Sequence, residues 1–188
     1  MTTTRKLGHK VKARSGKVIC SAAQKFKDLV YEMFDDVLIK SIPSVPIIKI
    51  YDLLQRIEFL EYQVVPDSEL NGQLAITYPD KRFIKISETV YNGACDGKGF
   101  HRFTLAHELG HLRLHVNESP KAYARGEEPG HKIFHDSEWQ ADEFASEFLM
   151  DTRELTGKES SLDLVFKYDV SGLAADSKIR KIRKIRKK

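Results

Sequence analysis

The chain has 188 residues and a formal net charge of +4, and 41% of its residues are hydrophobic against 31% charged. This length suits one domain with a small appendage, and the composition excludes a disordered or fibrous protein. No run approaches the roughly 18 apolar residues of a membrane span, and the basic N-terminus lacks the apolar stretch of a signal peptide. Because Cys20 and Cys95 lie far apart, outside metal-ligand spacing, we expect a cytoplasmic protein with reduced thiols.

The charge is distributed unevenly along the chain. Residues 1–20 hold six Lys or Arg and residues 178–188 hold eight, without an acidic residue in either segment. The intervening residues 21–177 hold 17 basic against 27 acidic residues. We expect the first segment to be a flexible arm. Both basic ends are either solvated tails or a means of weak, non-specific contact with DNA phosphates.

The first half of the chain predicts two helices followed by a small sheet. Apolar residues recur at helical spacing over residues 21–38 and again over residues 47–60, with Pro43 and Pro46 between them. The period then changes to that of strands. Short strands are predicted, the last two joined by a hairpin turn, over residues 62–65, 73–78 and 83–86.

The second half predicts mostly helices. Residues 88–100 contain several glycines and are expected to form a loop, and a longer loop is expected over residues 117–136. Ser137 followed by Gln140 has the spacing of a capping box, so a helix is expected to begin there. The predicted helices cover residues 102–116, 137–150, 161–167 and 172–185.

The strongest chemical signal is an H-E-x-x-H motif, formed by His107, Glu108 and His111 on a predicted helix. Residues at i and i+4 share a helix face, so both imidazoles can reach one ion. Glu108 is one residue further round and can approach a water molecule without binding the ion. Metal-assisted hydrolysis needs this arrangement, in which the metal polarises a water and a carbonyl and a carboxylate moves the proton.

Two histidines leave a catalytic zinc site one protein ligand short, because three are usual. A metzincin would have histidine six residues after His111, but Asn117 stands there. A glutamate on a later helix is the other common solution, and Glu138 fits it. Asp142, four residues on, is expected to accept the remaining N–H of a ligating histidine. The set His107, His111 and Glu138 favours Zn2+, with Mn2+ or Fe2+ as alternatives.

Other readings stay open for the polar residues around the motif. Glu138 and Asp142 could instead form the solvated face of an amphipathic helix. His115 lies about 12 Å along the axis from the first histidine of the motif, too far to share its ion, and is expected to pack or to form hydrogen bonds. His131 and His135 are candidates for stabilising an oxyanion or touching substrate, or for a surface role.

Residues 102–115, which contain the motif, and residues 138–150 resemble the ImmA/IrrE family of metallopeptidases. Residues 170–179 are similar to that family's short helix-turn-helix-like segment. The resemblance implies an α+β fold with a zincin-like metallopeptidase core, a small antiparallel sheet and a C-terminal helix-turn-helix-like segment. The predicted organisation is a flexible basic arm, a metallopeptidase domain and a helical segment with a basic tail, over residues 1–20, 21–155 and 156–188.

By position, His107, His111 and Glu138 match the family's metal ligands, and Glu108 matches its catalytic base. Asp142 stands where the family often has Asn. Family members are cytoplasmic zinc-dependent endopeptidases of bacteria and mobile elements. They cleave a helix-turn-helix transcriptional repressor, often one encoded beside them, so the resemblance implies an anti-repressor with a protein substrate of this kind.

Two functions therefore remain open. The first is a zinc-dependent endopeptidase that cleaves a regulatory protein, with a helix-turn-helix repressor as the expected substrate. The alternative is a non-proteolytic regulator that binds DNA or protein and has a structural or vestigial metal site. Glu108 favours the first, because a structural site does not require a base. Residues 172–177 have few side chains suited to reading bases, which favours a folding module or a substrate-docking element at this end.

Overall fold

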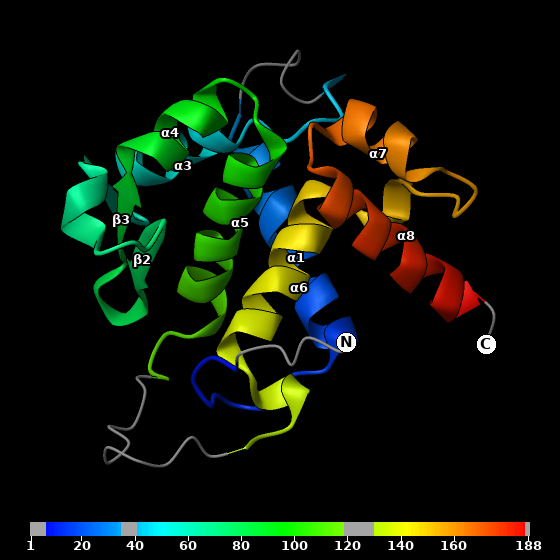
Figure 1. Ribbon diagram of the computed structural model, residues 1–188, viewed down its shortest axis with the longest axis horizontal. Helices are drawn as coiled ribbons and strands as arrows, with labels where there is room; N and C mark the ends of the chain where they lie inside the picture. The colour runs from blue at the N-terminus through cyan, green and yellow to red at the C-terminus, as the bar shows by residue number, and fades with distance from the viewer. Residues whose placement is uncertain (1–6, 35–40, 119–129, 187–188) are drawn as a thin grey trace.

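The computed structural model describes residues 7–34, 41–118 and 130–186, which form the predicted α+β fold (Figure 1). Helices α5 and α6 lie side by side at its centre. Helix α1 packs against α6, whereas α4 and strand β2 pack against α5 and α7 packs against α8. The helices have the bounds α1 Gly16–Glu32, α3 Ile47–Arg56, α4 Glu88–Cys95, α5 Gly99–Leu114, α6 Ser137–Leu149, α7 Ser161–Tyr168 and α8 Gly172–Arg186.

The apolar faces predicted for the central helices form the core. On α5, Leu105 and Leu109 are completely buried and Leu112 nearly so, and each such side chain contributes roughly 1.5–3 kcal/mol by leaving water. His107 and His111 lie on the opposite face of the same helix and are half-buried. Burial of the leucine face therefore fixes the rotation of α5 about its axis and turns both histidines toward α6.

The two central helices approach closely because their contact is made by small residues. A Cβ atom on Gly110 would lie 3.1 Å from the Cα of Ala141 and 3.2 Å from the Cβ of Phe144, tighter than ordinary van der Waals contact. Gly110 is thus the residue that lets the backbone of α6 come near the motif. On the α6 side, the small residue Ala141 allows this close packing.

The sheet is mixed, which corrects the prediction of an antiparallel sheet. Strand β2 pairs with β3 in the predicted antiparallel hairpin, but β1 pairs with β3 in parallel, giving the order β1-β3-β2. Turn residues identified the hairpin, whereas nothing in the sequence indicated on which side of β3 the first strand would pair. Strand β2 is left at the edge, against α5. The strands span β1 Glu61–Val65, β2 Ala75–Tyr78 and β3 Phe83–Ser87.

Two local predictions around the central helices are wrong. Residues 88–95, expected in a loop, form α4, because the hydroxyl of Ser87 caps its N-terminus by accepting from the backbone N–H of Val90. Helix α6 is capped one residue earlier than predicted, by the Asp136 carboxylate, which accepts from the backbone N–H of Trp139 at 2.8 Å. In both places a neighbouring N-cap residue outweighed the local signal, which was the glycines in one case and the capping-box spacing in the other.

The prediction of a flexible arm is also wrong for residues 7–20, whereas residues 1–6 lie outside the described residues. Helix α1 begins at Gly16, five residues before its predicted start, and is capped by the Ser15 hydroxyl. Ahead of it, Val11 is buried and its N–H donates to the carbonyl of His135 at 2.8 Å. The many basic residues suggested a solvated segment, but the contacts that order it are backbone hydrogen bonds and do not depend on side-chain charge. The division of the chain into three domains stays a prediction.

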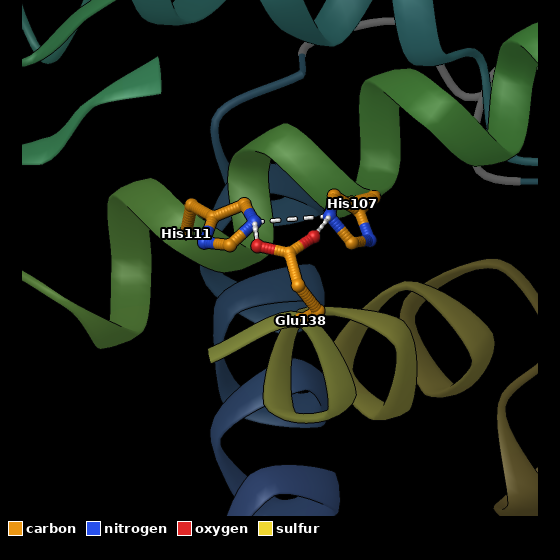
Figure 2. Close-up of side chains that lie close together, drawn as sticks. All are labelled: His107, His111 and Glu138. Carbon is orange, nitrogen blue, oxygen red and sulfur yellow. Dashed lines mark hydrogen bonds and ion pairs between the residues drawn. The ribbon is translucent and has the colours of Figure 1, made fainter. Parts of the chain in front are cut away.

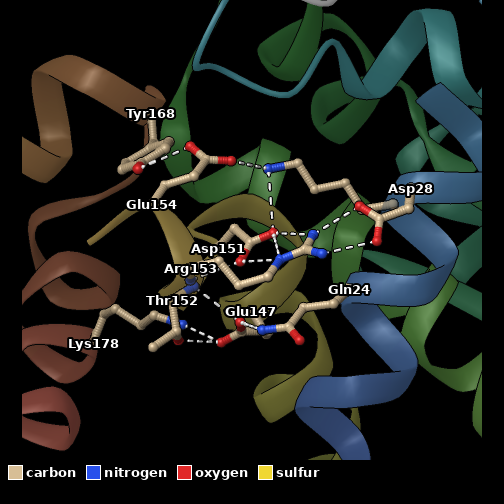
Figure 3. A network of polar contacts seen from close by, with 10 residues as sticks. Gln24, Asp28, Glu147, Asp151, Thr152, Arg153, Glu154, Tyr168 and Lys178 are labelled. Atoms are coloured by element: carbon tan, nitrogen blue, oxygen red, sulfur yellow. Dashed lines mark hydrogen bonds and ion pairs between the residues drawn. The ribbon is translucent and has the colours of Figure 1, made fainter. Parts of the chain in front are cut away.

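Helix α8 is attached to α6 through buried polar groups (Figure 3). The Lys178 ammonium lies 2.5 Å from a carboxylate oxygen of Glu147, and the two side chains are 5% and 1% exposed. Gln24 of α1 donates to the other oxygen of Glu147 at 2.6 Å. The C-terminal segment is therefore packed on the body of the protein as far as Arg186. Within the part of the chain that the structure describes, no helix is long and apolar enough to cross a bilayer.

Candidate metal centre

Helices α5 and α6 bring three side chains to one point (Figure 2). The Nε2 atoms of His107 and His111 are 2.9 Å apart, and the Glu138 carboxylate places one oxygen 3.2 Å from the first and the other 3.5 Å from the second. The potential ligand atoms of these three residues all lie within 4.8 Å of one another. The structure thus brings together the three residues that the sequence predicts as metal ligands.

Asp142 lies on the far side of His107 from this point. Its Oδ1 atom is 2.9 Å from His107 Nδ1. Because a carboxylate only accepts, Nδ1 must carry the proton that it donates, which leaves Nε2 as the nitrogen that faces Glu138 and His111 and can bind a metal. This is the position that the sequence predicts for Asp142.

The titration behaviour of the cluster reflects the convergence of acceptors. Burial lowers the pKa of His107, but hydrogen bonds to the carboxylates of Asp142 and Glu138 more than offset it and raise the pKa to about 10. Hydrogen bonds from His107 and His111 hold the pKa of Glu138 well below its usual range. Without a metal, the cluster therefore retains a proton in place of a cation.

The donor chemistry of the cluster fits a divalent cation. Two imidazole nitrogens and a carboxylate oxygen are the borderline ligands that zinc binds in catalytic sites. Lone pairs that point at one another within 3–4 Å repel unless a proton or a cation lies between them. His107, His111 and Glu138 would hold such an ion, and the same donor set accommodates manganese or iron.

Glu108, the predicted base, is buried beside this cluster. The Thr77 hydroxyl on the edge strand β2 donates to its Oε2 atom at 2.5 Å. Glu108 is 7% exposed, so its carboxylate is held in one orientation by a neighbouring strand. Thr77 belongs to no sequence motif and was not predicted, because it reaches the site through the packing of β2 against α5.

The three remaining candidate histidines, His115, His131 and His135, lie outside the cluster, and each is within hydrogen-bond distance of another group. His115 is buried, and its two ring nitrogens lie within hydrogen-bond distance of His111 and Gln140, as the expected bonding role requires. His131 Nε2 is 3.1 Å from the capping Asp136, and His135 Nδ1 donates to a backbone carbonyl at 3.1 Å. A contact of His131 or His135 with substrate stays a prediction.

Residues 76–167 match the family model of the M78 peptidases, described as the IrrE N-terminal-like domain. Over this segment the chain is similar to the M78 peptidases. The match covers just under half of the 188 residues, from β2 into α7, and includes the H-E-x-x-H motif and Glu138. It confirms the resemblance to the ImmA/IrrE metallopeptidases and indicates a protease-type, metal-dependent function. No curated protein matches the chain significantly.

Proposed function

We propose that this M78-family protein is a zinc-dependent endopeptidase that cleaves a regulatory protein. The observation that carries the proposal is the convergence of His107, His111 and Glu138 beside the buried carboxylate of Glu108. A structural metal site would need the three donors but would have no use for the fourth group.

Each residue around the centre has a separate role in the proposed peptide hydrolysis. A cation bound by the three donors supplies Lewis acidity toward a water molecule and the scissile carbonyl. Glu108 takes a proton from the attacking water and delivers it to the departing amine. Thr77 keeps the base in place by donating to Oε2, which leaves Oε1 to handle the proton. Asp142 keeps the donating lone pair of His107 turned inward.

The proposed substrate is a helix-turn-helix transcriptional repressor, and the protein is then an anti-repressor. The support is the resemblance of residues 102–115, 138–150 and 170–179 to the ImmA/IrrE family. Helix α8 offers a means of staying near a DNA-bound substrate, because its exposed Arg180 and Arg183 can contact phosphates weakly and without sequence preference.

The proposal is tested by incubating the zinc-loaded protein with the repressor encoded by the adjacent gene. We expect a single cut, and we expect Glu108→Gln to cut about 10²–10⁴-fold more slowly while keeping its zinc, because only the proton transfer is removed. Glu143→Gln is the matched control, since this α6 glutamate pairs with Lys181 of α8 and should leave the rate unchanged.

Equal cutting by the wild type and Glu108→Gln would contradict the proposal. Retarded migration of the repressor's operator DNA without any cut would support the non-proteolytic alternative. Stoichiometric zinc in a protein that leaves the repressor intact, but cuts another regulatory protein in a Glu108-dependent way, would contradict only the substrate.

A further inference from the structure

The second ligating histidine has a partner different in kind from that of the first. His107 faces a carboxylate, whereas the Nδ1 atom of His111 lies 3.0 Å from the Nδ1 atom of His115. Two imidazole nitrogens at this distance share one hydrogen, so one of them donates and the other accepts. Which nitrogen donates decides whether His111 can offer its other nitrogen to a metal.

The orientation of Gln140 decides this question. Its side-chain nitrogen donates to the backbone carbonyls of Lys12 and Phe134, at 2.8 and 2.9 Å. Its oxygen accepts from the Arg14 guanidinium at 3.0 Å. Since both amide hydrogens have acceptors, the oxygen must be the atom that faces His115 Nε2, 3.3 Å away. His115 therefore donates through Nε2.

The remaining nitrogen of His115 must then accept. His115 is 5% exposed, and among the described residues its ring nitrogens bond the imidazole of His111 and the amide of Gln140, with the Arg14 cation behind the amide. A second proton on this ring would place a charge beside a guanidinium in a buried site. With one proton, on Nε2, His115 accepts at Nδ1, so His111 donates from Nδ1 and directs the lone pair of Nε2 at His107 and Glu138.

We infer that His115, oriented by Gln140 and Arg14, is the positioning residue for His111, as Asp142 is for His107. This inference rests on the proposed metal centre and extends it into the segment ahead of α1. That segment also packs against the third ligand, Glu138, because a Cβ atom on Gly8 would collide with the Glu138 side chain. Arg14 is itself fixed by an ion pair with Glu118 and by donation to the carbonyl of Leu114 at 2.6 Å.

The test measures zinc affinity by competition with a chromophoric chelator, and it needs no substrate. His115→Leu removes the acceptor for His111 and is expected to weaken zinc binding about 10–100-fold, as loss of an outer-shell partner usually does. Asp142→Ala should cause a loss of the same order. His115→Asn places an amide oxygen where Nδ1 stands and should restore most of the affinity. His135→Ala is the control, because the His135 side chain donates to the backbone carbonyl of Val11 and lies outside the chain of contacts from Gln140 to His111.

The second readout is the tautomer of each imidazole in the zinc-loaded wild type, from two-bond ¹H–¹⁵N correlation spectra. We expect Nδ1–H on His111 and Nε2–H on His115. Nδ1–H on His115, or an affinity that His115→Leu leaves unchanged, overturns the inference. So does an equal loss in the Leu and Asn variants. A wild type that binds no zinc contradicts the proposed function instead, and thermal melting of each zinc-free variant separates misfolding from lost positioning.

Discussion

Helix α6 carries acidic side chains at both ends, and the two ends satisfy them in opposite ways. At the C-terminal end, the Glu147 carboxylate faces the Lys178 ammonium at 2.5 Å, and Asp151 just beyond the helix faces the Arg153 guanidinium at 2.6 Å (Figure 3). At the N-terminal end, the Glu138 carboxylate faces two imidazole nitrogens whose outer partners turn their lone pairs inward (Figure 2).

The contrast separates a structural network from a binding site. The chain itself supplies the cations at the C-terminal end, so that each acid there faces a cation of the fold. At the N-terminal end, the geometry brings acceptors together and leaves the cation to be supplied from outside. Burial of acids alone therefore says little about function, whereas the identity of the facing groups says much.

Removing one carboxylate from each end of α6 should give the largest difference between the two ends. Glu138→Ala is expected to lower zinc affinity by more than the roughly 100-fold that outer partners cost, because it deletes a ligand, and to leave the fold intact. Glu147→Ala should do the reverse, keeping stoichiometric zinc and losing stability. Zinc per protein after dialysis, together with urea unfolding, measures both. Stoichiometric zinc in Glu138→Ala would refute the ligand assignment.

The next effect concerns the buried cation of the structural network. Lys178→Met leaves Glu147 charged and buried without its partner, which should cost about 3–5 kcal/mol in the free energy of unfolding. Lys181→Met is the matched control on the same helix, since the Lys181 side chain is 42% exposed and its pair with Glu143 should contribute only about 0–1 kcal/mol.

A double variant tests whether the unpaired charge causes this loss of unfolding free energy. Lys178→Met combined with Glu147→Leu removes both charges and should recover most of the stability that the single change loses. If Lys178→Met and Lys181→Met lose equal amounts of unfolding free energy, the buried Lys178–Glu147 pair is not the source of the stability.

The smallest expected effect is a pH dependence confined to the structural end. Burial raises the pKa of Glu147, but the nearby Lys178 ammonium and hydrogen bonds from Lys178 and Thr152 lower it below its ordinary value of 4.5. The pair therefore stabilises the fold above about pH 4.5, and its contribution is lost as the pH falls through the folded pKa, by about 1.4 kcal/mol per unit of pKa shift.

Urea unfolding of the zinc-free protein at several pH values checks this dependence. The stability difference between the wild type and Glu147→Gln should shrink as the pH falls below about 4.5. A difference that stays constant down to pH 3 would indicate that Lys178 does not perturb Glu147.

The agreement between sequence and structure is best where short-range spacing carries the information. The i, i+4 spacing of His107 and His111 and the apolar stripe of α5 are properties of one helix, and both predictions rest on helix geometry alone. The parallel pairing of β1, the fold of the residues ahead of α1 and the residue that caps α6 were predicted wrongly, although α6 begins at Ser137 as expected. Each depends on contacts between segments more than ten residues apart or on a competing cap.

The α+β composition, the helical motif and the candidate ligands could be predicted because they follow from residue type and local period. Which acid meets which nitrogen depends on the tertiary contacts. The close approach of α5 and α6 at Gly110 brings Glu138 to the motif, and the packing of β2 on α5 brings Thr77 to Glu108. The orientation of His111 depends on Gln140 and Arg14, whose hydrogen bonds span over a hundred residues and leave no periodic trace in the sequence.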